Sequence, residues 1–130
     1  MYLRFVVPTI DDDSERMRGV FQAVGDLRGR GLFYPHEEEE LDYLRWWFNQ
    51  YLEKPTRFTT AKPPHYRRKW RAICWFKDSA RSHIWQIWGI VAILEDHGIP
   101  VRMLKEERVG YVVYEDDYQV AAEPFADTRC

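Results

Sequence analysis

The residue types best suited to chemistry gather in one basic, aromatic stretch, KPPHYRRKWR at positions 62–71. Lys and Arg neutralise phosphates, and aromatic faces stack on unpaired bases, so this composition suits contact with single-stranded nucleic acid. No helix-turn-helix, RNP or GxxG pattern accompanies it. Its cations also suit an acidic protein surface, or a solvated loop and sheet edge. The candidate nucleic-acid-binding residues are Lys62, His65, Tyr66, Arg67, Arg68, Lys69, Trp70 and Arg71.

A second group of chemically capable residues is the acidic run Glu115, Asp116 and Asp117 within YEDDYQ. Clustered carboxylates bind divalent cations or act as acid and base, which defines one alternative function, a small enzyme with an acidic hairpin site. Asp is also common at the tips of hairpins because it satisfies the turn backbone. We favour the turn interpretation.

Other candidate sites have simpler explanations. Ser79 and His83 lie within about one helical turn, but Ser79 is explained as a helix cap. His36 and Glu40 have the i, i+4 spacing of a ligand pair, and no further ligand stands near them in the sequence. We therefore expect no catalytic residue, no metal site and no cofactor.

The elements that position these groups follow from periodicity and turn residues, which predict an α+β fold in the order β-α-α-β-α-β-β-β. We expect a single mixed or antiparallel sheet, with about three helices packed on it, in one domain spanning 1–130. Strands are predicted at 2–7, 70–76, 101–106, 109–114 and 118–124. Helices are predicted from a cap at Asp13 or Ser14 to about Gly29, from Pro35 to about Lys54, and from a cap at Asp78 or Ser79 to about Gly98.

Two of these helices are predicted to expose aromatic or aliphatic side chains. At 100° per residue, Tyr43 and Trp46 lie opposite the apolar stripe of the second helix. The third helix is apolar on almost all sides, and Trp85 and Ile93 lie off its main stripe. Such a helix is either central to the fold or offered to a partner. Glutamates 37–40 are expected to be solvated at the positive end of the second helix.

Composition and charge restrict the function classes. The net charge of −2 argues against a protein that coats DNA by bulk electrostatics. The charge is segregated, because residues 54–77 hold eight Lys or Arg and no acid, whereas residues 106–127 hold seven acids and one Arg. Aromatic residues make up 16% of the chain, with six Trp. The longest apolar run, 84–94, is shorter than the ~20 residues of a membrane span. We expect a cytoplasmic protein without membrane association.

Four segments, MYLRFVVP, WWFNQYLEKPTRF, ICWFKDSA and above all VGYVVYEDDYQVAAEPFADT, resemble a family of small uncharacterised bacterial proteins. The resemblance implies a bacterial, cytoplasmic, single-domain protein, and it carries over no activity, cofactor or catalytic residue. The residues themselves favour a non-enzymatic interaction module that docks to a protein partner or to itself. Its predicted contact residues are Tyr43, Trp46, Trp85 and Ile93.

Overall fold

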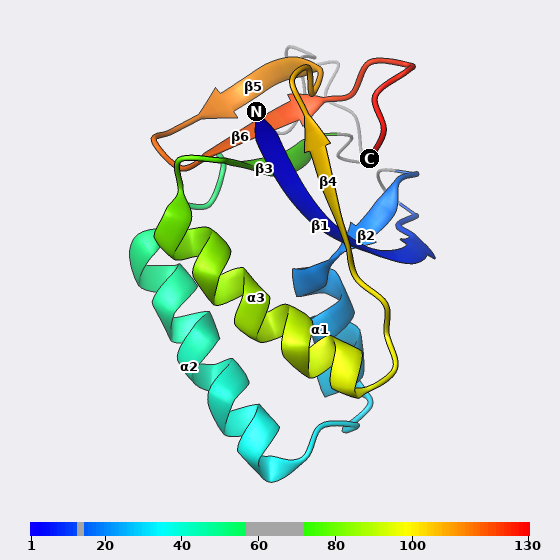
Figure 1. Cartoon of the computed structure of the whole chain (residues 1–130), viewed down its shortest axis with the longest axis vertical. Coiled ribbons are helices and arrows are strands. Elements are labelled where there is room, and N and C mark those ends of the chain that lie inside the picture. Colours follow the sequence, from blue (N-terminus) through cyan, green and yellow to red (C-terminus); the bar gives the residue numbers. More distant parts are fainter. Residues whose placement is uncertain (13–14, 57–71) are drawn as a thin grey trace.

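The computed structural model describes residues 1–12, 15–56 and 72–130 of the chain. These residues form one antiparallel sheet and three helices, which confirms the predicted α+β class and element order (Figure 1). The strands are β1 Tyr2–Ile10, β2 Met17–Gly19, β3 Ile73–Lys77, β4 Arg102–Glu106, β5 Tyr111–Glu115 and β6 Gln119–Glu123. The helices are α1 Val20–Gly29, α2 Pro35–Tyr51 and α3 Arg81–Asp96.

The short strand β2 is an addition to the predicted elements. The sequence predicts that the first helix starts at Asp13 or Ser14, which lie outside the described residues, but Met17 belongs to β2 and α1 begins at Val20. Gly19 is the N-cap of α1 in an extended conformation, and its N–H donates to Gln22 Oε1 at 3.1 Å. Met17, which falls within the predicted helix, is instead partly buried against the sheet.

Strand β1 has different neighbours along its two edges. Leu3 pairs with Lys105 of β4 and with Phe76 of β3, whereas Val6 pairs with Arg102 of β4 and with Gly19 of β2. Strands β3 and β2 thus follow one another along the same edge of β1, opposite β4. Arg4 and Phe5 lie in the interval where β3 has left β1 and β2 has not yet joined it.

The side chains of β1 point alternately to the two faces of the sheet and contribute to two apolar clusters. Leu3, Phe5 and Val7 face the three helices and belong to the larger apolar cluster, while Val6 faces the other side with Trp75 of β3 and belongs to the second cluster. In Figure 1 the three helices pack side by side below the strands, with α3 between α1 and α2. Because α3 has a neighbour on each side, a wide arc of its surface is buried.

The start and the outer face of α3 differ from the predictions. Ala80 is the N-cap and no side chain caps the helix, so neither Asp78 nor Ser79 has the capping role expected of it. Ile93 was expected on the exposed side, but it is buried, with 4% of its surface exposed. The prediction for Ile93 as a contact residue is therefore wrong, because α3 lies between two helices and buries this position as well.

The start of α2 also differs from the expectation of four solvated glutamates. Glu37 is buried, and its carboxylate accepts hydrogen bonds from Tyr34 N–H at 2.8 Å and lies 2.8 Å from His97 Nε2. The Tyr34 N–H and then the His97 side chain lower the pKa of Glu37, although burial acts against them. Glu37 thus links the first turn of α2 to the end of α3.

None of the helices in the described ranges is both long and apolar enough to cross a lipid bilayer.

Candidate functional site

The outer side of α2 carries three exposed aromatic side chains. Tyr43 and Trp46 are 53% and 51% exposed, as their position opposite the apolar stripe predicts, and their ring centroids are 6.0 Å apart. Tyr51, the last residue of α2, is 53% exposed, and its ring lies 6.5 Å from that of Trp46. The three rings form one contiguous group.

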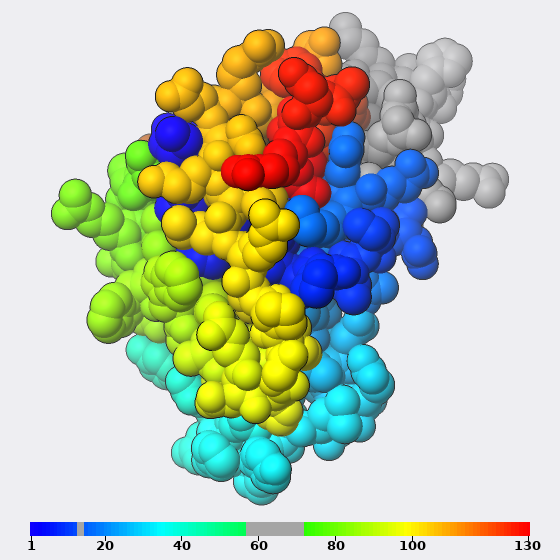
Figure 2. Space-filling view, turned by 45° about the vertical axis from the view of Figure 1, so that its right-hand side comes forward, coloured from blue at the N-terminus to red at the C-terminus, as the bar shows by residue number. Residues whose placement is uncertain are grey.

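This group continues onto α3 through Trp47. The Trp47 ring lies 4.9 Å from that of Tyr51, and Trp47 borders a shallow hollow whose other wall includes Trp85. Trp85 is 76% exposed, the largest value among the exposed apolar side chains of the described residues. We call Tyr43, Trp46, Trp47, Tyr51 and Trp85 the aromatic surface. The first half of α3, in green and yellow-green, stands out at the left edge of the space-filling view in Figure 2.

A buried histidine supports the aromatic surface from below. His83 of α3 is 4% exposed, and its Nε2 lies 2.7 Å from the Tyr51 carbonyl oxygen at the end of α2. Its ring is 4.9 Å from that of Trp47 and 4.3 Å from that of Tyr118. Together with the Glu37–His97 contact at the other end, this contact fixes both ends of α2 against α3.

The acidic hairpin between β5 and β6 has structural contacts. Asp116 accepts hydrogen bonds from Tyr118 N–H, Gln119 N–H and the Tyr114 hydroxyl at 2.8, 3.0 and 2.9 Å. Burial tends to raise the pKa of Asp116, but these hydrogen bonds outweigh it and lower the pKa. Glu115 forms an ion pair with Lys77 at 2.6 Å. These contacts support the turn interpretation for Glu115 and Asp116, while Asp117 is exposed at the tip.

A cleft of about 670 Å³ lies between α1, α2 and the interval in the sheet beside β1. Apolar side chains form most of its wall among the described residues, including Phe21, Leu44 and Phe48. Cys74 of β3, an exposed residue, also lines it, and desolvation by the surrounding protein raises the pKa of this thiol to about 11. Cys74 is therefore protonated at neutral pH and is a poor nucleophile.

Arg4 is the unusual residue of this cleft. It is 7% exposed, its Nη2 donates to the Met17 carbonyl oxygen, and its Nη1 has no acceptor among the described residues. Burial lowers the pKa of Arg4. A buried donor without a partner costs ~1–3 kcal/mol, and more when it is charged. A signal for Arg4 was present in the sequence, since it interrupts the apolar strand YLRFVV at a position that alternation assigns to the sheet interior.

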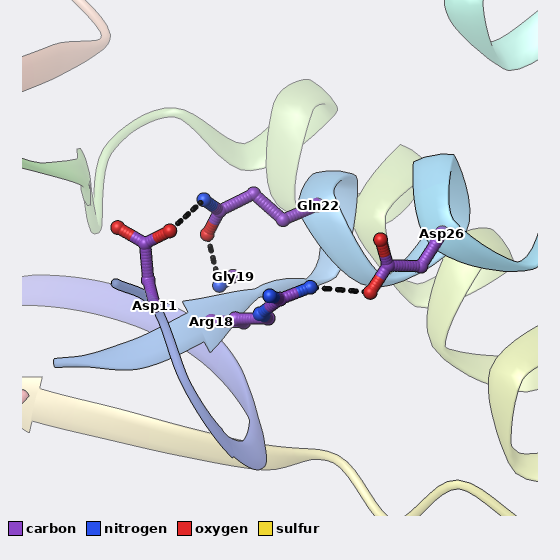
Figure 3. A network of polar contacts seen from close by, with 5 residues as sticks. All are labelled: Asp11, Arg18, Gly19, Gln22 and Asp26. Atoms are coloured by element: carbon purple, nitrogen blue, oxygen red, sulfur yellow. Dashed lines mark hydrogen bonds and ion pairs between the residues drawn. The ribbon is translucent and has the colours of Figure 1, made fainter. Parts of the chain in front are cut away.

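The rim of the cleft at the start of α1 is polar and well ordered by hydrogen bonds (Figure 3). Gln22 reaches from the first turn of α1 to the loop after β1, where its Nε2 donates to Asp11 Oδ1 at 3.1 Å, while its Oε1 accepts from Gly19 N–H. On the neighbouring side Arg18 of β2 forms an ion pair with Asp26 of α1. These contacts hold α1 against the end of β1 and β2.

The remaining predicted residues are placed as follows. The candidate nucleic-acid segment, Lys62 and His65 to Arg71, lies outside the described residues. Within the described residues no group of three or more His, Cys, Asp or Glu side chains is arranged to hold a metal ion. Comparisons with protein-family models, with curated proteins and with solved structures found no match to this chain.

Proposed function

We propose that the protein is a non-enzymatic interaction module that associates with a second copy of itself through the aromatic surface. The observation that carries this proposal is the contiguous group of half-exposed and largely exposed rings on α2 and α3. Tyr and Trp are enriched in the centres of protein interfaces because they bury a large area at a low cost in conformational entropy.

The size of the aromatic surface fits a dimer. Tyr43, Trp46, Tyr51 and Trp85 are between 51% and 76% exposed. With ~200 Å² per aromatic side chain, they offer on the order of 450 Å² in each copy. Two copies would bury about 900 Å² from these rings alone, and flanking residues would raise the total above the ~1,000 Å² expected of a specific interface.

Charges around the aromatic surface favour a second copy as the occupant. Exposed Glu39 lies seven residues before Trp46, on the same side of α2. Exposed Arg81 borders the hollow between Trp47 and Trp85, near the other end of α2. A two-fold axis near the middle of α2 makes the two α2 helices antiparallel and brings Glu39 of each copy toward Arg81 of the other.

Sedimentation velocity over a dilution series tests the proposal. We expect the wild-type protein to dimerise and Trp46→Ala to weaken the dimer while its circular dichroism and melting temperature stay close to those of the wild type. Tyr111→Ala is the matched control, because Tyr111 is 62% exposed but lies on β5, away from the aromatic surface. A wild-type protein that stays monomeric at about 1 mM, where even complexes of about −4 kcal/mol form, would overturn self-association.

A further inference from the structure

Strand β4 is an edge of the sheet that stays regular along its whole length. All of its residues, Arg102 to Glu106, pair with β1, and no other strand among the described residues lies along its opposite edge. The edge strand β5, by contrast, has an irregular register between Val112 and Tyr114, and β2 has three residues. Irregular and short edges resist pairing with a further strand. The edge of β4 is therefore the one that can accept such a strand.

The sequence of β4, RMLKE, is complementary to itself when two copies run antiparallel. With Leu104 of each copy at the two-fold axis, Arg102 lies opposite Glu106 of the other copy, and Met103 lies opposite Lys105. Opposite charges directly across two strands are favourable, and like charges are unfavourable. A register with Lys105 at the axis would place the two lysines opposite each other. The charges thus favour the register centred on Leu104.

The backbone of β4 suits the same register. On the β3 side of β1, the Met1 carbonyl oxygen accepts a hydrogen bond from Asp78 N–H at 3.2 Å. Successive residues of a strand turn their backbone groups to opposite edges, so the even-numbered residues of β1 turn theirs toward β4. Their partners include Leu104, which leaves the backbone groups of Met103 and Lys105 facing outward. These are the two residues that the register centred on Leu104 places opposite each other.

Apolar side chains lie beside this edge on the helix face of the sheet. Trp88 of α3 is 47% exposed and its ring lies 5.2 Å from that of Phe5, whose partner Met103 is 41% exposed. The aliphatic stem of Lys105 from a second copy would cover Met103. Joined through β4, the two β1 strands would lie three strand spacings, or about 14 Å, apart. Packed helices lie ~8–10 Å apart, so there is room for one α3 beside each β1.

We propose that β4 pairs with β4 of a second copy, so that the two sheets form one continuous sheet. The yellow to orange segment that includes β4 lies on the surface in Figure 2, above α3. This interface shares no residue with the aromatic surface, so it goes beyond the association proposed above and does not depend on it. Two five-residue strands offer less area than the ~1,000 Å² of a stable interface, so the β4 contact is the weaker of the two and forms at higher protein concentration.

Sedimentation velocity of charge-reversed variants tests the pairing, in a parent chain that carries Trp46→Ala and Trp85→Ala to remove the contact through the aromatic surface. Arg102→Glu and Glu106→Arg each place like charges opposite each other twice in the dimer, so each should raise the dissociation constant at least about tenfold. Mixed in equal amounts, the two variants should regain the constant of the parent chain to within about threefold, because each acid again lies opposite a base. A folding defect in either variant would not produce this recovery.

Arg30→Glu is the matched control, because it makes the same charge change at an exposed residue at the end of α1 and should leave the constant unchanged. The proposal is overturned if the parent chain stays monomeric at about 1 mM, if both charge variants associate as the parent chain does, or if their mixture associates no better than either variant alone. Failure of the aromatic surface would appear separately, as an unchanged dissociation constant when the two Trp substitutions are introduced into the wild-type protein.

Discussion

Truncation of Trp85 to alanine should separate the proposed interface from the fold. Trp85 is 76% exposed, so only about a quarter of its surface is buried in a single copy. For an aromatic side chain of ~150–250 Å², the buried quarter is on the order of 50 Å², and at ~25 cal/mol per Å² it contributes about 1 kcal/mol to folding. A change of that size lowers the melting temperature of a chain of this length by a few degrees.

The expected effect on self-association is larger. A Trp that an interface buries fully costs about 2 kcal/mol or more when it is truncated. In a two-fold dimer each copy loses the ring, so the loss is about 4 kcal/mol, or on the order of a thousandfold in the dissociation constant. Sedimentation velocity gives this constant, and thermal unfolding of dilute samples gives the stability of the single copy.

The Tyr111→Ala variant controls for the loss of any exposed ring, and it should change the dissociation constant by less than about threefold, as expected for a residue outside the interface. The reasoning is refuted if Trp85→Ala dimerises as the wild type does, or if it destabilises the single copy by as much as it weakens the dimer. The second result would mean that the Trp85 ring supports the fold more than its exposure indicates.

Two further predictions concern the scaffold. Gly110→Ala should destabilise the protein by more than about 3 kcal/mol in urea unfolding, because Gly110 has φ +128° and the new Cβ would lie 2.0 Å from a backbone oxygen of β6. Gly25→Ala is the control, because a Cβ at Gly25 in α1 meets open space, and it should stabilise the protein by ~0.5–1 kcal/mol. An equal loss of stability in both variants would contradict this account. Glu37→Gln should lower the free energy of unfolding most at neutral pH, since a lowered pKa in the folded state gives stability above the ordinary carboxyl pKa of 4.5 that is lost as the pH falls through the folded value. The same loss at every pH would show that the charge of Glu37 is not involved.

Much of the fold could be predicted from the sequence because the spacing of apolar residues reflects which face of a strand or helix is buried. The strand pattern of YLRFVV and the helical spacing of Leu41, Leu44 and Phe48 both correspond to buried faces. Strand β2 could not be predicted this way, because three residues show no period and their pairing with β1 depends on the tertiary structure. The same applies to the buried Glu37, whose partner His97 is sixty residues away.

The candidate sites also divide into those that local periodicity predicts and those that depend on the tertiary structure. The exposure of Tyr43 and Trp46 could be predicted because α2 is covered on one side. The rotation of 100° per residue then places both residues opposite the buried stripe of this helix. The same reasoning gives the wrong exposure for Ile93, because the sequence does not show that α3 packs between two other helices. Arg4 has a sequence signal, a charge within an apolar strand, but the interval between β3 and β2 that turns it into a cleft residue exists only in three dimensions.

Helix α2 separates the aromatic surface from the cleft. Its outer side carries Tyr43 and Trp46, and its inner side contributes Leu44 and Phe48 to the cleft. A change in the cleft would affect dimerisation only by moving α2, and such a coupling would be the same in both directions. Both ends of α2 are fixed to α3, by the Glu37–His97 contact and by His83 at the end of the helix. A helix held at both ends transmits little displacement, so we expect the aromatic surface to keep its arrangement whatever occurs in the cleft.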